Sequence, residues 1–149
     1  MRFLQALIAF LALPGIVAFV LPAALTWSTA HGQIAHPLGA VPLLPGTAGL
    51  LWCARDFYVS GKGTLAPWAP PRHLVVIGLY RFSRNSMYVC VVLILLGWTA
   101  LMPSAEMVFY TFAVVVAFHL RVVLGEEPWL ARTHGDAWTR YAARVRRWL

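Results

Sequence analysis

The chain has 149 residues, of which 60% are hydrophobic and only 11% are charged, whereas a soluble domain typically carries roughly 25% charged residues. This composition excludes an ordinary soluble surface. The net charge of +7 would suggest nucleic acid as the partner of a soluble protein, but in so apolar a chain anionic lipid headgroups are the expected partners of the arginines. We therefore expect membrane lipids, and no nucleic acid, as partners.

The first apolar run spans residues 3–27, and no Asp, Glu, Lys or Arg occurs between Arg2 and Arg55. That stretch has room for two bilayer crossings at about 20 residues each. The run is longer than the roughly 7 to 15 residues of a signal-peptide core, so we expect a retained helix instead of a cleaved signal. Pro14 and Pro22 predict an irregular helix, which membranes tolerate when neighbouring helices bond the freed carbonyls.

Three further apolar runs follow, at 38–58, 87–101 and 107–124. Pro42 and Pro45 interrupt the early part of the second run, so it is expected to be kinked or shortened. The sequence therefore predicts a single all-α integral membrane domain over residues 1–149, with about four transmembrane helices.

The Lys and Arg side chains are unevenly distributed among the segments that connect the apolar runs. The connection at 28–37 has no Lys or Arg, whereas the loop at 60–86 and the tail at 125–149 are basic. By the positive-inside rule, the loop, the tail and both termini are cytoplasmic. The high share of arginine among the cations indicates a bacterial source, so the inner membrane is the expected location.

The tail from Pro128 onward has the pattern of an amphipathic helix with arginines opposite an apolar side. Such a helix is expected to lie at the membrane interface, where Trp and Tyr rings settle at headgroup depth. The apolar side comprises Trp129, Leu130, Trp138, Tyr141 and Val145.

Two cytoplasmic segments hold the residues suited to binding. The loop at 60–86 is rich in Gly, Pro and aromatic residues directly before a span, and loops on a rigid scaffold commonly bind ligands. After the last span come Glu126 and Glu127, followed by Pro128. Taken alone, this acid pair fits the solvated N-terminus of a helix, and with Arg84 and Arg121 available as partners a functional role is also open.

The stretch GTLAPWAPPRHLVVIGLYRFSRNSMY, an apolar hairpin and EEPWLARTHGDAWTRYAARVRRW occur in this order. Over about residues 61–148 this order resembles the isoprenylcysteine carboxyl methyltransferase family, which is related to phospholipid methyltransferases. The resemblance implies a membrane enzyme that binds S-adenosylmethionine in the segments 60–86 and 125–149 and methylates a lipophilic acceptor. The acceptor group is open between a carboxylate, a thiol and an amine headgroup. The resemblance places the cofactor contacts at Arg72, His73, Leu74, Val75, Tyr80, Asn85, Ser86, Met87, Tyr88, Glu126 and Glu127.

Three positions depart from the family pattern. Ser86 stands where the family usually has Pro, and we expect its hydroxyl to cap the third span. His134 replaces Phe before Gly135, a change in packing with little expected consequence. Val122 stands where eukaryotic members have an Arg four residues before the acid; Arg121 is its neighbour, but one residue turns a helical side chain by about 100°.

The candidate catalytic residues are Arg84 or Arg121, to orient an acceptor carboxylate or phosphate, and His119, to accept a proton from an amine or thiol. A His inside an apolar span can equally be a bonded structural group. His31 and His36 lack neighbouring acids or cysteines, so no metal site is predicted. The alternative is a non-catalytic adaptor or transporter-like protein, although the spans lack the internal acid that a proton-coupled carrier needs.

Overall fold

A computed structural model describes residues 11–30, 36–60 and 74–149. This part of the chain is helical and forms no β-sheet, which confirms the predicted all-α class. Predicted features in the first ten residues and at 61–73 lie outside the described residues. The elements in chain order are η1 (Leu11–Val20), α2 (Leu21–Ala30), η2 (Pro37–Gly39), α3 (Ala40–Ser60), η3 (Gly78–Arg81), α4 (Ser86–Leu101), α5 (Ala105–Arg121), η4 (Val122–Glu126) and α6 (Glu127–Arg144).

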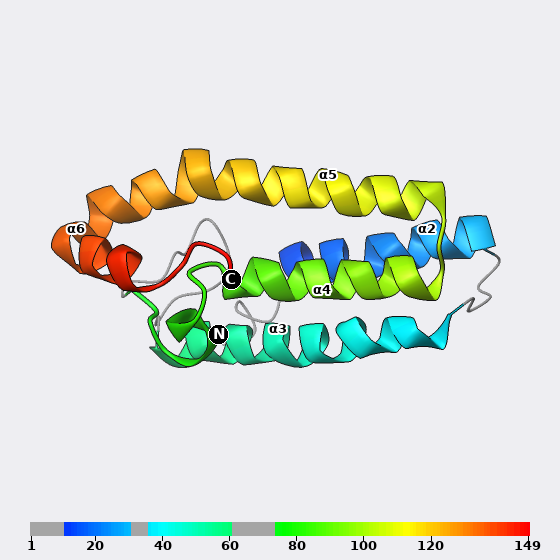
Figure 1. Cartoon of the computed structure of the whole chain (residues 1–149), viewed down its shortest axis with the longest axis horizontal. Helices are drawn as coiled ribbons and strands as arrows, with labels where there is room; N and C mark the ends of the chain where they lie inside the picture. Colours follow the sequence, from blue (N-terminus) through cyan, green and yellow to red (C-terminus); the bar gives the residue numbers. More distant parts are fainter. Residues whose placement is uncertain (1–10, 31–35, 61–73) are drawn as a thin grey trace.

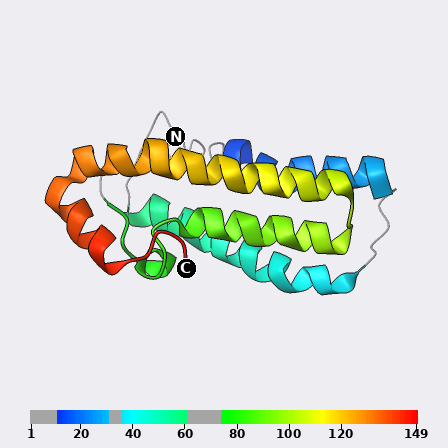
Figure 2. The ribbon, with the colours of Figure 1, turned by 45° about the horizontal axis from the view of Figure 1, so that its top comes forward.

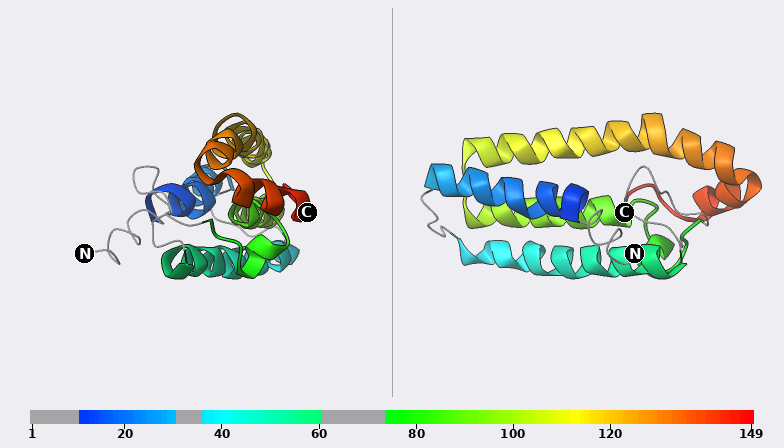
Figure 3. Two further views of the ribbon diagram at one scale, coloured as in Figure 1. Left: turned by 90° about the vertical axis from the view of Figure 1, so that its left-hand side faces the viewer. Right: turned by 180° about the vertical axis from the view of Figure 1, so that it is seen from behind.

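The long helices lie alongside one another, with η1 and α2 forming one continuous rod (Figure 1). Helix α4 is central, because it contacts α3, α5 and η1. The end-on view in Figure 3 shows the rods grouped around it. At one end of the bundle α6 turns back from α5, and the tail after it runs beside the loop that precedes α4 (Figure 2). The binding segments therefore gather at that end.

Two helical stretches are long and apolar enough to cross a bilayer, Pro37–Val59 and Ala105–Arg144. Two shorter apolar helices, Pro14–Ser28 and Ser86–Leu101, lie beside them. Large apolar side chains such as Phe109 point outward and are exposed. An exposed apolar surface of this kind is suited to lipid and not to water, so these helices indicate a membrane protein.

Helix α3 is continuous, contrary to the kinked or shortened span expected from its prolines. Pro42 falls in the first turn of the helix, where a backbone N–H has no partner to lose. Pro45 lies inside the helix, which continues through it to Ser60. The single lost bond is tolerated because α3 packs closely on α4 along most of its length.

Glycines let α3 and α4 approach closely. A Cβ atom added to Gly39 would lie 2.5 Å from the Gly97 carbonyl oxygen, and one on Gly46 would lie 2.9 Å from the Cys90 carbonyl oxygen. Small residues at such contacts are typical of membrane helix pairs, which gain van der Waals packing from the close approach. The contact buries the core side chains Leu50, Cys53, Val91, Ile94 and Leu95.

The irregular first rod is bonded by its neighbours, as expected for a proline-containing membrane helix. Pro22 has no N–H, so one carbonyl of the preceding turn loses its helical donor. Trp98 Nε1 donates to the Ala18 oxygen at 3.1 Å, and the Tyr110 hydroxyl donates to the Val17 oxygen at 2.9 Å. Side chains of α4 and α5 thus supply donors to the turn that Pro22 leaves one backbone donor short.

Candidate functional site

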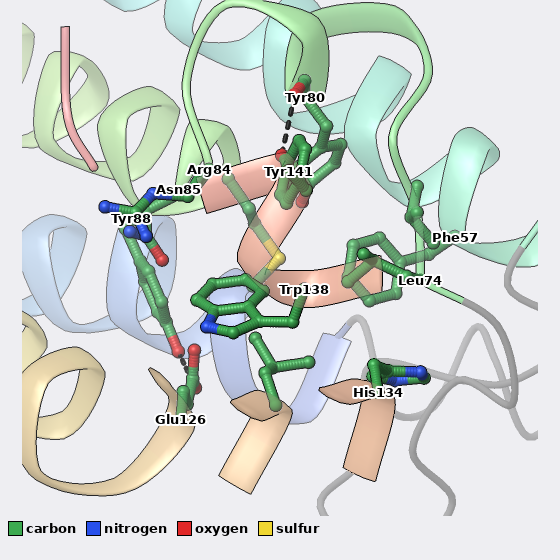
Figure 4. Close-up of a pocket in the computed structure, with 13 residues that line it drawn as sticks. Phe57, Leu74, Tyr80, Arg84, Asn85, Tyr88, Glu126, His134, Trp138 and Tyr141 are labelled. Atoms are coloured by element: carbon green, nitrogen blue, oxygen red, sulfur yellow. Dashed lines mark hydrogen bonds between the residues drawn. The ribbon is translucent and has the colours of Figure 1, made fainter. Parts of the chain in front are cut away.

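A cavity lies where the loop before α4, the start of α4, the η4–α6 junction and the end of α3 meet (Figure 4). It measures about 570 Å³ including its open mouth. Aromatic and apolar side chains dominate its walls, with a few polar groups between them. The lining residues are Phe57, Leu74, Val75, Tyr80, Arg84, Asn85, Met87, Tyr88, Glu126, Leu130, His134, Trp138 and Tyr141.

The loop wall is positioned by a glycine and a buried acid. Gly78 adopts φ +57°, a conformation that favours glycine, and an added Cβ would collide with Asp56 Oδ2 of α3. Asp56 is only 2% exposed. From Gly78 the chain enters η3, where the Tyr80 carbonyl accepts a 2.7 Å hydrogen bond from the Tyr141 hydroxyl of α6. Asp56 therefore has a role in shaping the site that the sequence pattern did not reveal.

The first residues of α4 are bonded to the loop before them. We expected the Ser86 hydroxyl to cap this helix, and this expectation is wrong: its oxygen lies 2.8 Å from the carbonyl oxygens of both Leu79 and Ser83. A hydroxyl has one proton to donate, and here it is donated backward to the loop instead of receiving a helix N–H. Ser86 thus fixes the loop against α4 and does not line the cavity.

The C-terminal tail runs beside the same loop and is bonded to it through the backbone. The Arg84 N–H donates to the Arg146 oxygen at 2.9 Å, and Asn85 Nδ2 donates to the Arg147 oxygen at 2.9 Å. Ser83 and Arg146 form an isolated parallel bridge. The Asn85 side chain, a predicted cofactor contact, lines the cavity, and its amide nitrogen donates to the tail.

Glu127 closes this clasp. Arg147 binds it with two hydrogen bonds, Nε to Oε1 at 3.0 Å and Nη2 to Oε2 at 2.8 Å, and Arg84 Nη1 lies 3.3 Å from Oε1. The Glu127 and Arg84 side chains are 15% and 13% exposed. The hydrogen bonds from Arg147 to Glu127 raise the pKa of the guanidinium further above its usual value. We call these three residues the Glu127 clasp.

Glu126, one residue earlier, faces the cavity instead. Its Oε1 accepts a very short hydrogen bond from the Tyr88 hydroxyl and a 2.8 Å bond from Arg121 Nε. Arg121 Nε also lies 3.1 Å from the Tyr88 oxygen. Both bonds to the carboxylate end on Oε1, which leaves Oε2 for a ligand in the cavity.

A π-helical turn explains how Arg121 reaches Glu126. Residues Val122–Glu126 form η4, in which the Glu127 N–H bonds the Val122 oxygen five residues back. In a regular helix the residue four positions before an acid shares its face, and that residue is Val122, which is completely buried. The wider turn brings the position five residues back into contact instead. Arg121 was expected to point away because it lies one position too early. The π-helical turn of the backbone compensates for this difference.

Aromatic rings form the remaining walls. The Arg84 guanidinium lies over the Trp138 ring at 5.3 Å from its centre, a cation–π arrangement. Tyr80 meets Phe57 edge to face, with ring centres 5.4 Å apart. Burial raises the pKa of Tyr80 well above its usual range, so its phenol stays neutral. The result is a flat, largely apolar slot with charged groups at its margin.

The predicted site residues divide into four groups. Leu74, Val75, Tyr80, Arg84, Asn85, Met87, Tyr88 and Glu126 all line the cavity. Glu127 and Arg121 are not among the lining residues but bond to some of them, and Ser86 bonds the Leu79 and Ser83 carbonyls of the loop. His119 is also not a lining residue, and its ring stacks on Trp148 at 6.0 Å. Arg72 and His73 fall outside the described residues.

Five lining residues were missed by sequence reasoning: Phe57, Leu130, His134, Trp138 and Tyr141. The sequence did carry a signal for the α6 members, because several of them belong to the apolar side of the amphipathic tail. That side was assigned to the membrane interface. In the structure α6 turns back over the loop, so part of its apolar side covers the cavity (Figure 4).

The cavity has unused polar atoms that a ligand could bond. Arg84 Nε and His134 Nε2 are buried and have no hydrogen-bond partner among the described residues, a situation that normally costs energy. Together with the Glu126 carboxylate and the aromatic walls, they suit a ligand with a cationic group and a flat heteroaromatic ring. In the described part of the chain, His, Cys, Asp and Glu side chains form no group of three or more that could hold a metal ion.

Residues 50–137, more than half of the chain, match the sequence model of a family described as phospholipid methyltransferase. No curated protein and no solved structure matches the chain. The matched range includes α4, α5, the acid pair and His134, and it ends before the tail that closes the clasp.

Proposed function

The chain belongs to the phospholipid methyltransferase family, and from this premise we propose that it transfers a methyl group from S-adenosylmethionine to a lipid acceptor at the cytoplasmic face of a membrane. Methyltransferases of this family generally use that cofactor. The observation that carries the proposal is Glu126, a carboxylate held by Tyr88 and Arg121 at the wall of an aromatic cavity.

The cavity residues fit this cofactor chemically. Glu126 would hold the ammonium group of its methionyl part by charge and hydrogen bonding. The slot formed by Phe57, Leu74 and Trp138 would take the flat base, because aromatic rings pack well face to face or edge to face. The bound cofactor supplies an electrophilic methyl group on a sulfonium, and the protein contributes positioning and exclusion of water.

The acceptor would approach from the lipid side. Arg121 is half exposed, with its side chain 53% accessible, and its Nε is already fixed on Glu126. The rest of its guanidinium would orient an anionic group of the acceptor, such as a lipid phosphate. Arg84 is less suited to this role, because the Glu127 clasp and Trp138 already engage it. The description of the matched family favours a phospholipid over a prenylcysteine as the acceptor.

We propose that all four rods cross the bilayer and that both termini lie in the cytoplasm. Two rods are long enough by themselves. The two shorter ones, the first rod and α4, contact each other and α5, and α4 also contacts α3. The basic tail and the described part of the loop before α4, residues 74–85, lie at the same end of the bundle (Figure 1), an arrangement that the positive-inside rule favours. A bacterial inner membrane is the setting we propose for this arrangement.

Titration calorimetry of the purified protein in detergent with S-adenosylmethionine tests the cofactor site. We expect binding to wild type and a loss of about 1 to 3 kcal/mol, roughly 5- to 150-fold in Kd, for Glu126→Gln. Glu106→Gln is the matched control, because Glu106 is exposed in the first turn of α5. No heat with wild type, or equal Kd values for the two variants, would contradict the proposal.

A second assay identifies the acceptor. Labelled cofactor is incubated with the protein and vesicles that contain either an aminophospholipid or a prenylcysteine methyl acceptor. Label in the phospholipid is the expected result. Tight cofactor binding without transfer to any component of a membrane extract would indicate a non-catalytic family member.

A further inference from the structure

His134 is the most unusual group of the cavity wall. Its Nε2 is buried and has no hydrogen-bond partner in the described residues, while its ring meets Trp129 edge to face at 6.2 Å. It stands directly before Gly135, whose φ of +48° breaks the helical path inside α6. This local turn, which favours glycine, allows the residue before it to face the cavity.

The imidazole lies away from the acid. Figure 4 shows Glu126 and Tyr88 on one side of Trp138, with His134 on the other side near Leu74 and Phe57. Those neighbours are apolar or aromatic and offer the ring nitrogen no bond. A buried imidazole nitrogen in such surroundings forfeits its hydrogen bond to water unless a ligand replaces it.

The ligand that fits these surroundings is flat and carries hydrogen-bonding atoms on its edge. A lipid chain would fill the space but leave Nε2 unbonded, and an anion would be drawn toward Arg84 instead. A purine base satisfies both requirements, because its faces pack on aromatic walls while its edge presents an amine and ring nitrogens. Glu126 at one end of the cavity therefore matches the amino group of a nucleoside-linked amino acid, and His134 at the other end matches its base.

We propose that His134 Nε2 bonds the base edge of the cofactor and sets the preference of this protein for adenine. The proposal rests on the proposed function, since it assigns the second end of the same cavity. A residue first interpreted as a neutral packing change then becomes a specificity determinant. Phenylalanine, the usual family residue at this position, could supply the packing but not the hydrogen bond.

Calorimetry with two nucleoside ligands tests the assignment: S-adenosylhomocysteine, and S-inosylhomocysteine, in which a carbonyl replaces the amine of the base. We expect wild type to discriminate between them by about tenfold, which corresponds to one net hydrogen bond to the amine of the base. In His134→Phe the ratio should fall below about twofold, because the bonding atom is lost while the ring is kept. His134→Gln should retain part of the preference, since its side chain can still donate and accept.

His119→Phe is the matched control, because His119 lies outside the cavity and stacks on Trp148. Circular dichroism of each variant establishes that the fold is kept. An unchanged ratio in a folded His134→Phe overturns this inference alone. If wild type binds neither nucleoside, the proposed function fails, and this inference fails with it.

Discussion

Glu126 and Glu127 are adjacent and chemically identical, yet the two sides of the η4–α6 junction use them differently. Glu127 has both oxygens bonded by arginines from the loop and the tail. Glu126 is bonded through one oxygen and turns its other oxygen toward the cavity. Neighbouring helical residues point about 100° apart. One junction can therefore use one acid to hold the fold together and direct the adjacent acid toward a ligand.

The largest expected effect is on stability and comes from breaking the Glu127 clasp. Glu127→Gln leaves the half-buried Arg84 and the more exposed Arg147 without their carboxylate. We expect a loss of roughly 2 to 3 kcal/mol in the free energy of unfolding, because the charged acceptor of several hydrogen bonds is removed from a partly buried place. Thermal unfolding in detergent measures it, with the exposed Asp136→Asn on α6 as control. Equal unfolding midpoints for the two variants would show that the clasp is not structural.

A smaller effect is expected from loosening the Glu126 side. Tyr88→Phe removes the hydroxyl that orients the carboxylate, so the Kd for S-adenosylmethionine should rise about fivefold, corresponding to roughly 1 kcal/mol. Tyr110→Phe removes a hydroxyl that bonds the Val17 carbonyl inside the bundle. That control should lower the unfolding midpoint and leave the Kd unchanged. An unchanged Kd in Tyr88→Phe together with a raised Kd in Tyr110→Phe would contradict the assignment of Tyr88 to binding and Tyr110 to stability.

The smallest effect is expected from restoring the family residue at the start of α4. In Ser86→Pro, proline is tolerated at the first helical position, but the hydroxyl bonds to the loop are lost. Asn85 also adopts φ −121° and ψ 37°, outside the extended region favoured before proline. We expect a net loss of about 1 kcal/mol in stability and a Kd within about twofold of wild type. Ser86→Ala separates the lost hydroxyl from the backbone effect.

The helices were predictable because long apolar runs dominate this sequence, and the ordered motifs pointed to the family that the sequence match then established. The need to bond the carbonyl freed by Pro22 was also predictable, although the side-chain donors Trp98 and Tyr110 were not. Those donors lie more than 70 residues away in the chain. No local pattern encodes such a distance.

The finer arrangement of the site escaped prediction for a related reason. The expected position of Arg121 assumed a regular helix, and a π-turn is not visible in hydrophobic periodicity. Glu127 was assigned to the cofactor because its partner Arg147 reaches it only after α6 turns back. His134 was treated as packing, since nothing in the sequence shows that its nitrogen is left unbonded.

The turn before Pro22 also bears on how the helices come together. Pro22 leaves this turn one backbone donor short, Trp98 and Tyr110 donate to it, and an unbonded carbonyl in an apolar environment costs several kcal/mol. The first rod is therefore more favourable when it is packed against α4 and α5 than when it is alone. The hydrogen bonds from Trp98 of α4 and Tyr110 of α5 thus join the first rod to helices that are synthesised after it.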